Sequence, residues 1–135
     1  MADTQKFTTP PTLEDFAAVA EQALADIPAD LSALVDGVAL RVDDFPDEET
    51  VREMELESPF DLLGLYSGVP FGEKTMAMAA QPDMIFLYRR PILDYWCDSG
   101  EDLTHVIKHV LIHEIGHHYG LSDDDMEALE AQAGP

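Results

Sequence analysis

The sequence is poor in basic residues, in cysteine and in long apolar runs. Only seven Lys and Arg stand against 28 Asp and Glu in 135 residues, for a formal net charge of −21. So few cations suit neither nucleic-acid phosphates nor an anionic membrane surface, and we expect neither as a partner. The single cysteine, Cys97, excludes an intramolecular disulfide framework. No apolar run approaches the ~20 residues of a membrane span.

The ends and the length of the chain predict one soluble domain. The N-terminal residues MADTQKFTTPPT lack a basic start and an apolar stretch, so no secretory signal is visible and we expect a cytoplasmic protein. A hydrophobic content of 46% with 26% charged residues is typical of a globular chain. We therefore expect one domain over residues 1–135, with residues 1–11 as a loose leader.

The hydrophobic pattern predicts a mixture of helices and short strands, which is an α+β fold. Thr12 is a candidate N-cap for the first helix, and Ser122 for the last. The expected elements, in chain order, are a helix over 13–27, a short helix over 30–37, a strand over 38–42, an exposed acidic helix over 47–57, an edge strand over 65–69, a buried strand over 84–88, a helical turn over 91–96, a long helix over 101–119 and a final helix over 123–133.

The long helix carries the sequence's chemical signal, the pattern His-Glu-x-x-His. Its middle is apolar almost all round, which predicts burial. His113 and His117 stand four residues apart, so both imidazoles can reach one zinc ion from the same side of a helix. Glu114 points beside the metal, where a carboxylate can take a proton from a zinc-bound water. The spacing therefore predicts a zinc site with Glu114 as general base.

The residues after the motif supply a candidate third ligand. Gly120 can take a left-handed turn that ends the helix, and Asp123 follows three residues later. Two histidines and a carboxylate form an open site that leaves a fourth position for water. The alternative is that the acids of residues 123–125 only offset the helix dipole. In that case Glu127 or Glu130 would be the substitute ligand if the last helix folds across the site.

The motif H-E-x-x-H-x-x-G-x-x-D, together with the segments LLGLYSGVPF and MIFLYRRP and an acidic C-terminal helix, resembles the minimal zincin family of small bacterial zincin-like metallopeptidases. The resemblance covers most of the chain from about Leu13 onward. It implies a compact zincin-like core, with a small twisted mixed sheet of about three strands, a buried active-site helix and a short C-terminal helix. It also implies an edge strand at residues 65–69 that pairs with extended substrate.

Several other residues are weighed against this site. His105 and His109 continue the four-residue spacing, but we expect them at the surface, because His105 lies about 12 Å along the helix from His113. We expect His118 to be a packed ring. Tyr66, Tyr119 and Arg89 are candidates to stabilise an oxyanion on chemistry alone. Cys97 is expected to be packed.

The leading hypothesis is a metallopeptidase with one Zn²⁺ ion held by His113, His117 and Asp123, acting on a peptide or protein. Glu114 would accept the proton of the metal-activated water and pass it to the leaving amine. The first alternative is a non-catalytic metal-binding module that interacts with a protein partner or has a regulatory role. The second is hydrolysis of a non-peptide amide by the same chemistry.

Overall fold

The computed structural model describes residues 9–35, 37–68 and 83–133. Its elements are α1 (Leu13–Ala25), α2 (Ala29–Ser32), β1 (Ala39–Asp43), α3 (Glu48–Glu53), the 3-10 turn η1 (Pro59–Asp61), β2 (Gly64–Ser67), β3 (Met84–Tyr88), α5 (Arg89–Ser99), α6 (Leu103–His118) and α7 (Asp123–Ala133). The α+β prediction is therefore confirmed. None of these helices is long and apolar enough to cross a bilayer.

The strands of the described residues form a small mixed sheet in the order β1-β3-β2. Central β3 pairs in parallel with β1 and antiparallel with β2. Ile85 and Leu87 of β3 are fully buried on one face, whereas on the other face Met84 and Phe86 are partly buried and Tyr88 is buried. The prediction of a buried strand at 84–88 is thus right about its central place, and its second face is less completely covered than its first.

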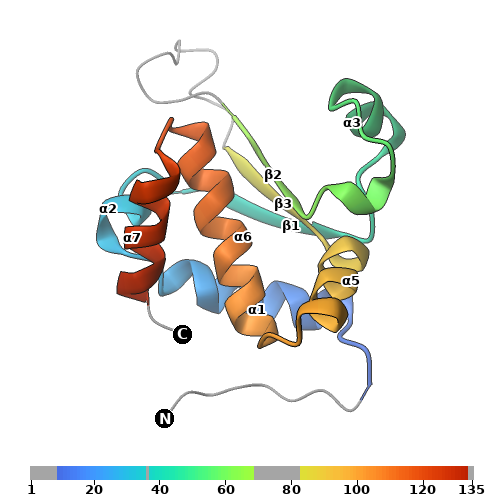
Figure 1. Ribbon diagram of the computed structural model, residues 1–135, viewed down its shortest axis with the longest axis horizontal. Helices are drawn as coiled ribbons and strands as arrows, with labels where there is room; N and C mark the ends of the chain where they lie inside the picture. The colour runs from blue at the N-terminus through green and yellow to red at the C-terminus, as the bar shows by residue number, and fades with distance from the viewer. Residues whose placement is uncertain (1–8, 36, 69–82, 134–135) are drawn as a thin grey trace.

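Helices α1 and α6 cover the buried face of this sheet. Helix α1 packs on β1 and α6 packs on β2, and the two helices contact each other (Figure 1). Thr12 caps α1 as predicted, through a reciprocal capping box with Asp15. The core between helices and sheet is apolar, with Phe16, Ile107 and Ile112 among its completely buried residues. Helix α6, which carries the sequence motif, therefore lies against the hydrophobic core along most of its length.

Helix α7 turns back along α6, and one glycine makes the turn. Gly120 has φ +75°, and the N–H of Leu121 donates to the carbonyl of Gly116 at 2.8 Å. This Schellman arrangement ends α6 where the sequence predicts. Further along, Gly116 lies against Met126, because a Cβ at Gly116 would come within 2.5 Å of the Met126 sulfur. The close contact sets α7 directly beside α6 (Figure 1).

Several element boundaries differ from the sequence expectations, among them the end of α3, which lies at Glu53 rather than at residue 57. Helix α2 begins after Pro28 rather than at Asp30, and ends well before Gly37. The edge strand begins one residue earlier than predicted and ends at Ser67, while the predicted end at residue 69 lies outside the described residues. Helix α5 starts at Arg89, because Pro91 falls in a first turn whose N–H groups have no partner within the helix. Of the predicted leader, residues 9–11 form no helix or strand, and residues 1–8 lie outside the described residues.

Candidate metal centre and its surroundings

Helix α6 places the three motif residues in two successive turns. The rings of His113 and His117 are perpendicular, with centroids 5.7 Å apart. The His113 side chain is 29% exposed, and His117 is exposed. Each imidazole is thus accessible to an ion from solvent while the helix backbone beneath them is fixed by the core.

Glu114 lies where α6 packs on β2. Burial raises the pKa of its carboxyl to about 7, and a hydrogen bond from the backbone N–H of Tyr66 partly opposes that rise. The close approach depends on Gly64, because a Cβ there would lie 2.7 Å from Val110 Cγ1 and 3.5 Å from Glu114 Cγ. A carboxyl with a pKa near neutrality can both take and return a proton. Glu114 therefore has the properties of a general acid-base.

The outer edge of β2 is the side that faces away from β3. The N–H of Tyr88 donates to the carbonyl of Leu63, which fixes the alternation of hydrogen-bonded pairs in this ladder. By that alternation, Gly64 and Tyr66 direct their N–H and C=O groups outward, and the bond from Tyr66 to Glu114 uses one of them. No strand of the described residues pairs with this edge. An extended peptide could add there as a further strand.

Asp123, the predicted third ligand, is the first residue of α7 and is exposed. The neighbouring Asp125 forms a capping box with Ser122, with backbone-to-side-chain distances of 3.1 and 3.2 Å. One of the three acids therefore caps the helix, as the alternative interpretation proposed. The structure does not gather Asp123 and His117 around His113 within 4.8 Å. Both stay predictions as ligands.

A different set of donors does come together, formed by His109, His113 and Glu130. Their ligand atoms all lie within 4.8 Å of one another. Glu130 uses one carboxylate oxygen for His109 Nδ1 and the other for His113 Nε2, the latter at 3.3 Å. Sequence reasoning named Glu130 as a substitute ligand but left His109 at the surface. The signal for His109 was its four-residue spacing to His113, which equals that of the motif pair.

Two further histidines, His105 and His118, lie outside this cluster, and neither was expected to bind the metal. His105 pairs with Glu101 of the preceding turn at 3.3 Å. The ring of His118 stacks on Tyr66 with centroids 4.0 Å apart and an angle of 18° between the planes. His118 is therefore a packed ring that supports β2 on α6.

The three oxyanion candidates already have partners. The Tyr66 hydroxyl donates to Asp83 at 2.8 Å, and burial with this bond raises the pKa of the phenol strongly. The Tyr119 hydroxyl donates to the carbonyl of Leu34 at 3.0 Å. Arg89 starts α5, where it donates to the carbonyl of Pro11 and to Asp44. All three side chains hold structural contacts, and we assign none of them to the reaction.

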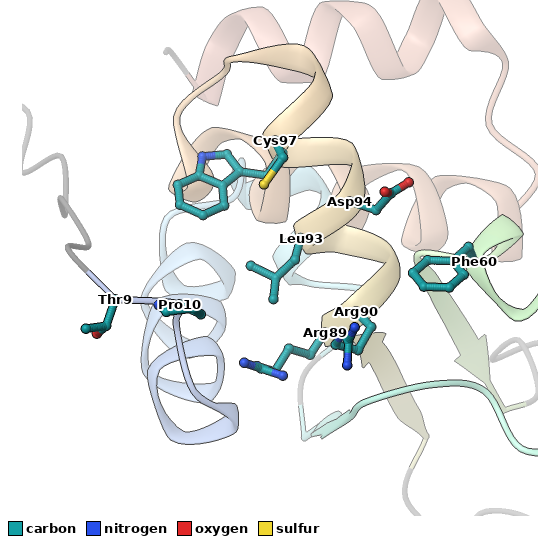
Figure 2. A pocket seen from close by; sticks show the side chains of 9 residues that line it. Thr9, Pro10, Phe60, Arg89, Arg90, Leu93, Asp94 and Cys97 are labelled. Atoms are coloured by element: carbon teal, nitrogen blue, oxygen red, sulfur yellow. The ribbon is translucent and has the colours of Figure 1, made fainter.

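A hollow of about 710 Å³ on α5 lies apart from the histidines (Figure 2). Leu93 and Trp96 give it an apolar wall, to which Phe60 of η1 contributes from the other side. Arg89 is engaged as described above, so it has no evident role toward a ligand here. Cys97 also lines this hollow and is exposed, so the expectation that it is packed is wrong. The reason is its position on the outer side of α5, turned away from the core.

Comparisons with known proteins identify the family of this chain and support its fold. A family model described as zincin-like metallopeptidase matches residues 35–133, and the chain therefore belongs to that family. Among solved structures, a conserved hypothetical protein from T. thermophilus matches with a TM-score of 0.54 and 22% identity, covering 81% of this chain and 94% of that one. This likeness supports the fold. No curated protein matches the chain.

The family implies a metal, and the donors present on α6 fit one. Two imidazoles four residues apart with a carboxylate within reach form the donor set that zinc takes in open sites. His113 belongs to both possible groupings, the motif pair with His117 and the cluster with His109 and Glu130. We therefore treat His113 as the fixed member of the metal centre.

Proposed function

We propose that this protein is a zinc-dependent metallopeptidase in which Glu114 acts as general base. The observation that supports it most is the position of Glu114, which follows His113 on α6 and receives a hydrogen bond from the edge strand at Tyr66. The same residue thus adjoins a metal ligand on one side and a strand able to hold a peptide on the other. These are the two things that peptide hydrolysis by a zincin-like protein requires.

In this proposal the metal ligands and the general base are different residues of the same region. His113 and His117 would hold zinc, with Asp123 as the proposed third ligand. When bound, zinc would polarise the scissile carbonyl and make the attacking water more acidic. Glu114 takes the proton of that water and returns it to the leaving amine, a transfer suited to a carboxyl whose pKa is about 7.

The proposed substrate is an extended peptide segment laid along the outer edge of β2. The outward groups of Gly64 and the outward carbonyl of Tyr66 supply main-chain hydrogen bonds that do not depend on the substrate's side chains. This mode of binding would place a backbone carbonyl beside Glu114 whatever the residue type. A substrate must therefore present an unstructured stretch, such as a terminus or a loop.

The test compares Glu114→Gln with Glu21→Gln on a library of unstructured peptides. Glu21 is an exposed acid of α1 and serves as a matched control. We expect Glu114→Gln to lose ~100-fold or more of turnover, because proton transfer is removed, while zinc content measured by atomic emission is unchanged. Turnover that survives in Glu114→Gln contradicts the mechanism. No cleavage by the wild type, with zinc retained, would favour the non-catalytic module.

The same zinc measurement tests the ligands. His113→Ala should lose zinc and turnover together. Asp123→Ala should bind zinc more weakly than the wild type, since an open site loses one of its three protein ligands. An Asp123→Ala protein with wild-type zinc affinity would remove Asp123 from the site.

A further inference from the structure

We propose that His109, His113 and Glu130 form a second divalent-cation site, which excludes an ion at the His113–His117 position because both need His113. The donors are two imidazole nitrogens and one carboxylate, from two helices. The site would bridge α6 and α7, which touch at Gly116 and Met126 one turn away. The second site itself does not depend on the peptidase assignment, whereas its competition with the His113–His117 position rests on the metal site of the proposed function.

The distances are compatible with an ion once Glu130 moves away from His109. Around tetrahedral zinc with bonds of 2.0–2.1 Å, two ligand atoms are about 3.4 Å apart. His113 Nε2 and Glu130 Oε2 are separated by 3.3 Å, which also suits an ordinary ion pair, and all three donors lie within 4.8 Å of one another. The rings of His109 and His113 lie side by side, with centroids at 4.1 Å. His109 Nδ1 contacts Glu130 directly, so that carboxylate oxygen must withdraw from the ring to admit an ion.

Burial and access also suit a cation. The side chains of His109, His113 and Glu130 are 43%, 29% and 20% exposed, so the carboxylate is sheltered while the imidazoles are open to solvent. With neutral imidazoles the three groups carry one negative charge, on a chain whose formal net charge is −21. Both the local and the overall field therefore attract a divalent cation.

The two ion positions exclude each other because both use the imidazole of His113. His113 has one nitrogen, Nε2, directed at Glu130, and its lone pair can serve one ion. An ion shared with His117 requires the ring to turn toward the next helical turn instead. Zinc added to the protein should thus distribute between two positions and never fill both. The ion held at His109 and Glu130 lies on the side of α6 that faces α7.

The experiment titrates zinc chloride into chelator-treated full-length protein by calorimetry. His117→Ala removes the motif pair and leaves the proposed site, so we expect one zinc to bind still. Adding Glu130→Gln to His117→Ala should weaken that binding by ~10-fold or more, while adding Glu21→Gln, at an exposed position of α1, should not. His113→Ala should remove both sites. The wild type should bind one zinc, not two.

Two results would overturn the proposal. One is a folded His117→Ala protein that binds no zinc, and the other is an equal effect of Glu130→Gln and Glu21→Gln on zinc binding in that background. Two zinc ions bound through histidine in the wild type would refute the exclusion. Nuclear magnetic resonance of the imidazoles in the wild type gives an independent measurement, because it needs no variant. There the His109 ring should shift with zinc and that of His105 should not. An unmoved His109 at saturating zinc would equally refute the site.

Discussion

At the scale of single residues, ionising the buried carboxyl of Glu114 reduces the free energy of unfolding of the whole protein. Its carboxyl is placed where α6 meets β2, and burial raises its pKa from the ordinary 4.5 to about 7. The hydrogen bond from Tyr66 favours the ionised form but does not cancel the loss of water. The functional protonation behaviour and the stability of the fold are therefore linked through one side chain.

This linkage predicts how stability depends on pH in the metal-free protein. Below about pH 4.5 the carboxyl is protonated in both the folded and unfolded states and contributes no difference. Between about pH 4.5 and pH 7 the unfolded state ionises while the folded state keeps its proton, so stability falls. Above pH 7 both states are ionised and the loss levels off. The wild type should thus lose roughly 2 to 3 kcal/mol of stability relative to Glu114→Gln between about pH 4.5 and pH 8.

Urea unfolding of both proteins in the presence of a chelator measures that difference. Other titrating groups cancel because the two proteins share them. The pair formed by the wild type and Glu127→Gln, changed at an exposed position, should give a difference nearly independent of pH. If the stability difference between the wild type and Glu114→Gln also does not change with pH, then Glu114 ionises in the folded state as readily as in water.

At the scale of elements, the spacing between β2 and α6 depends on Gly64. A methyl group there would meet Val110 Cγ1 at 2.7 Å and the carbonyl oxygen of Phe86 at 3.1 Å. Gly64→Ala should therefore push the strand from the helix and destabilise the protein by about 1–3 kcal/mol. The bond from Tyr66 to Glu114 should lengthen with it, so turnover should fall too.

A double-mutant cycle separates this contact from a general effect on the strand. Val110→Ala removes the nearer of the two clashing atoms, so the pair Gly64→Ala and Val110→Ala should cost less than the sum of the single changes. Ser67→Ala, at the exposed end of β2, is the control and should be nearly neutral. If the destabilisations of the two single changes simply add up in thermal unfolding, the effect of Gly64→Ala does not arise from its contact with Val110.

Sequence reasoning predicted most elements because their signals are local. Each signal lies within a few residues of the feature it determines. Examples are the capping box of Thr12, the left-handed conformation of Gly120 and the apolar residues on nearly all sides of α6. The pairing of His109 with Glu130 joins residues 21 apart and exists only because Met126 fits against Gly116. No local pattern encodes such a fit. The motif on α6 was thus predictable and Glu130 could be named as a substitute ligand, while the pairing of Glu130 with His109 was not predicted.

At the scale of the whole molecule, the excess of acidic residues governs behaviour in salt. The formal charge of −21 causes self-repulsion that is larger when the chain is compact. Local pairs such as Arg89 with Asp44 and Arg41 with Asp43 are partly exposed and oppose it weakly. Screening should therefore stabilise the fold as salt increases.

We expect the Tm of the metal-free protein to rise by about 5 °C from about 20 mM to about 500 mM NaCl, which corresponds to roughly 1 kcal/mol. Circular dichroism measures it, with sorbitol at matched osmolality as control. A Tm that falls with salt would mean that the local ion pairs outweigh the repulsion.

The outer edge of β2 has a consequence for how copies of this protein meet one another. An edge with outward N–H and C=O groups is a template for the same strand of a second copy, and such pairing leads to aggregation. Two molecules that each carry −21 repel before those edges approach, over a range set by the Debye length. The acidic surface thus opposes edge-to-edge pairing of β2 between two copies, which would otherwise block the edge proposed to bind substrate. Added salt should therefore have two effects. It stabilises each folded molecule, and it weakens the repulsion that keeps two copies apart.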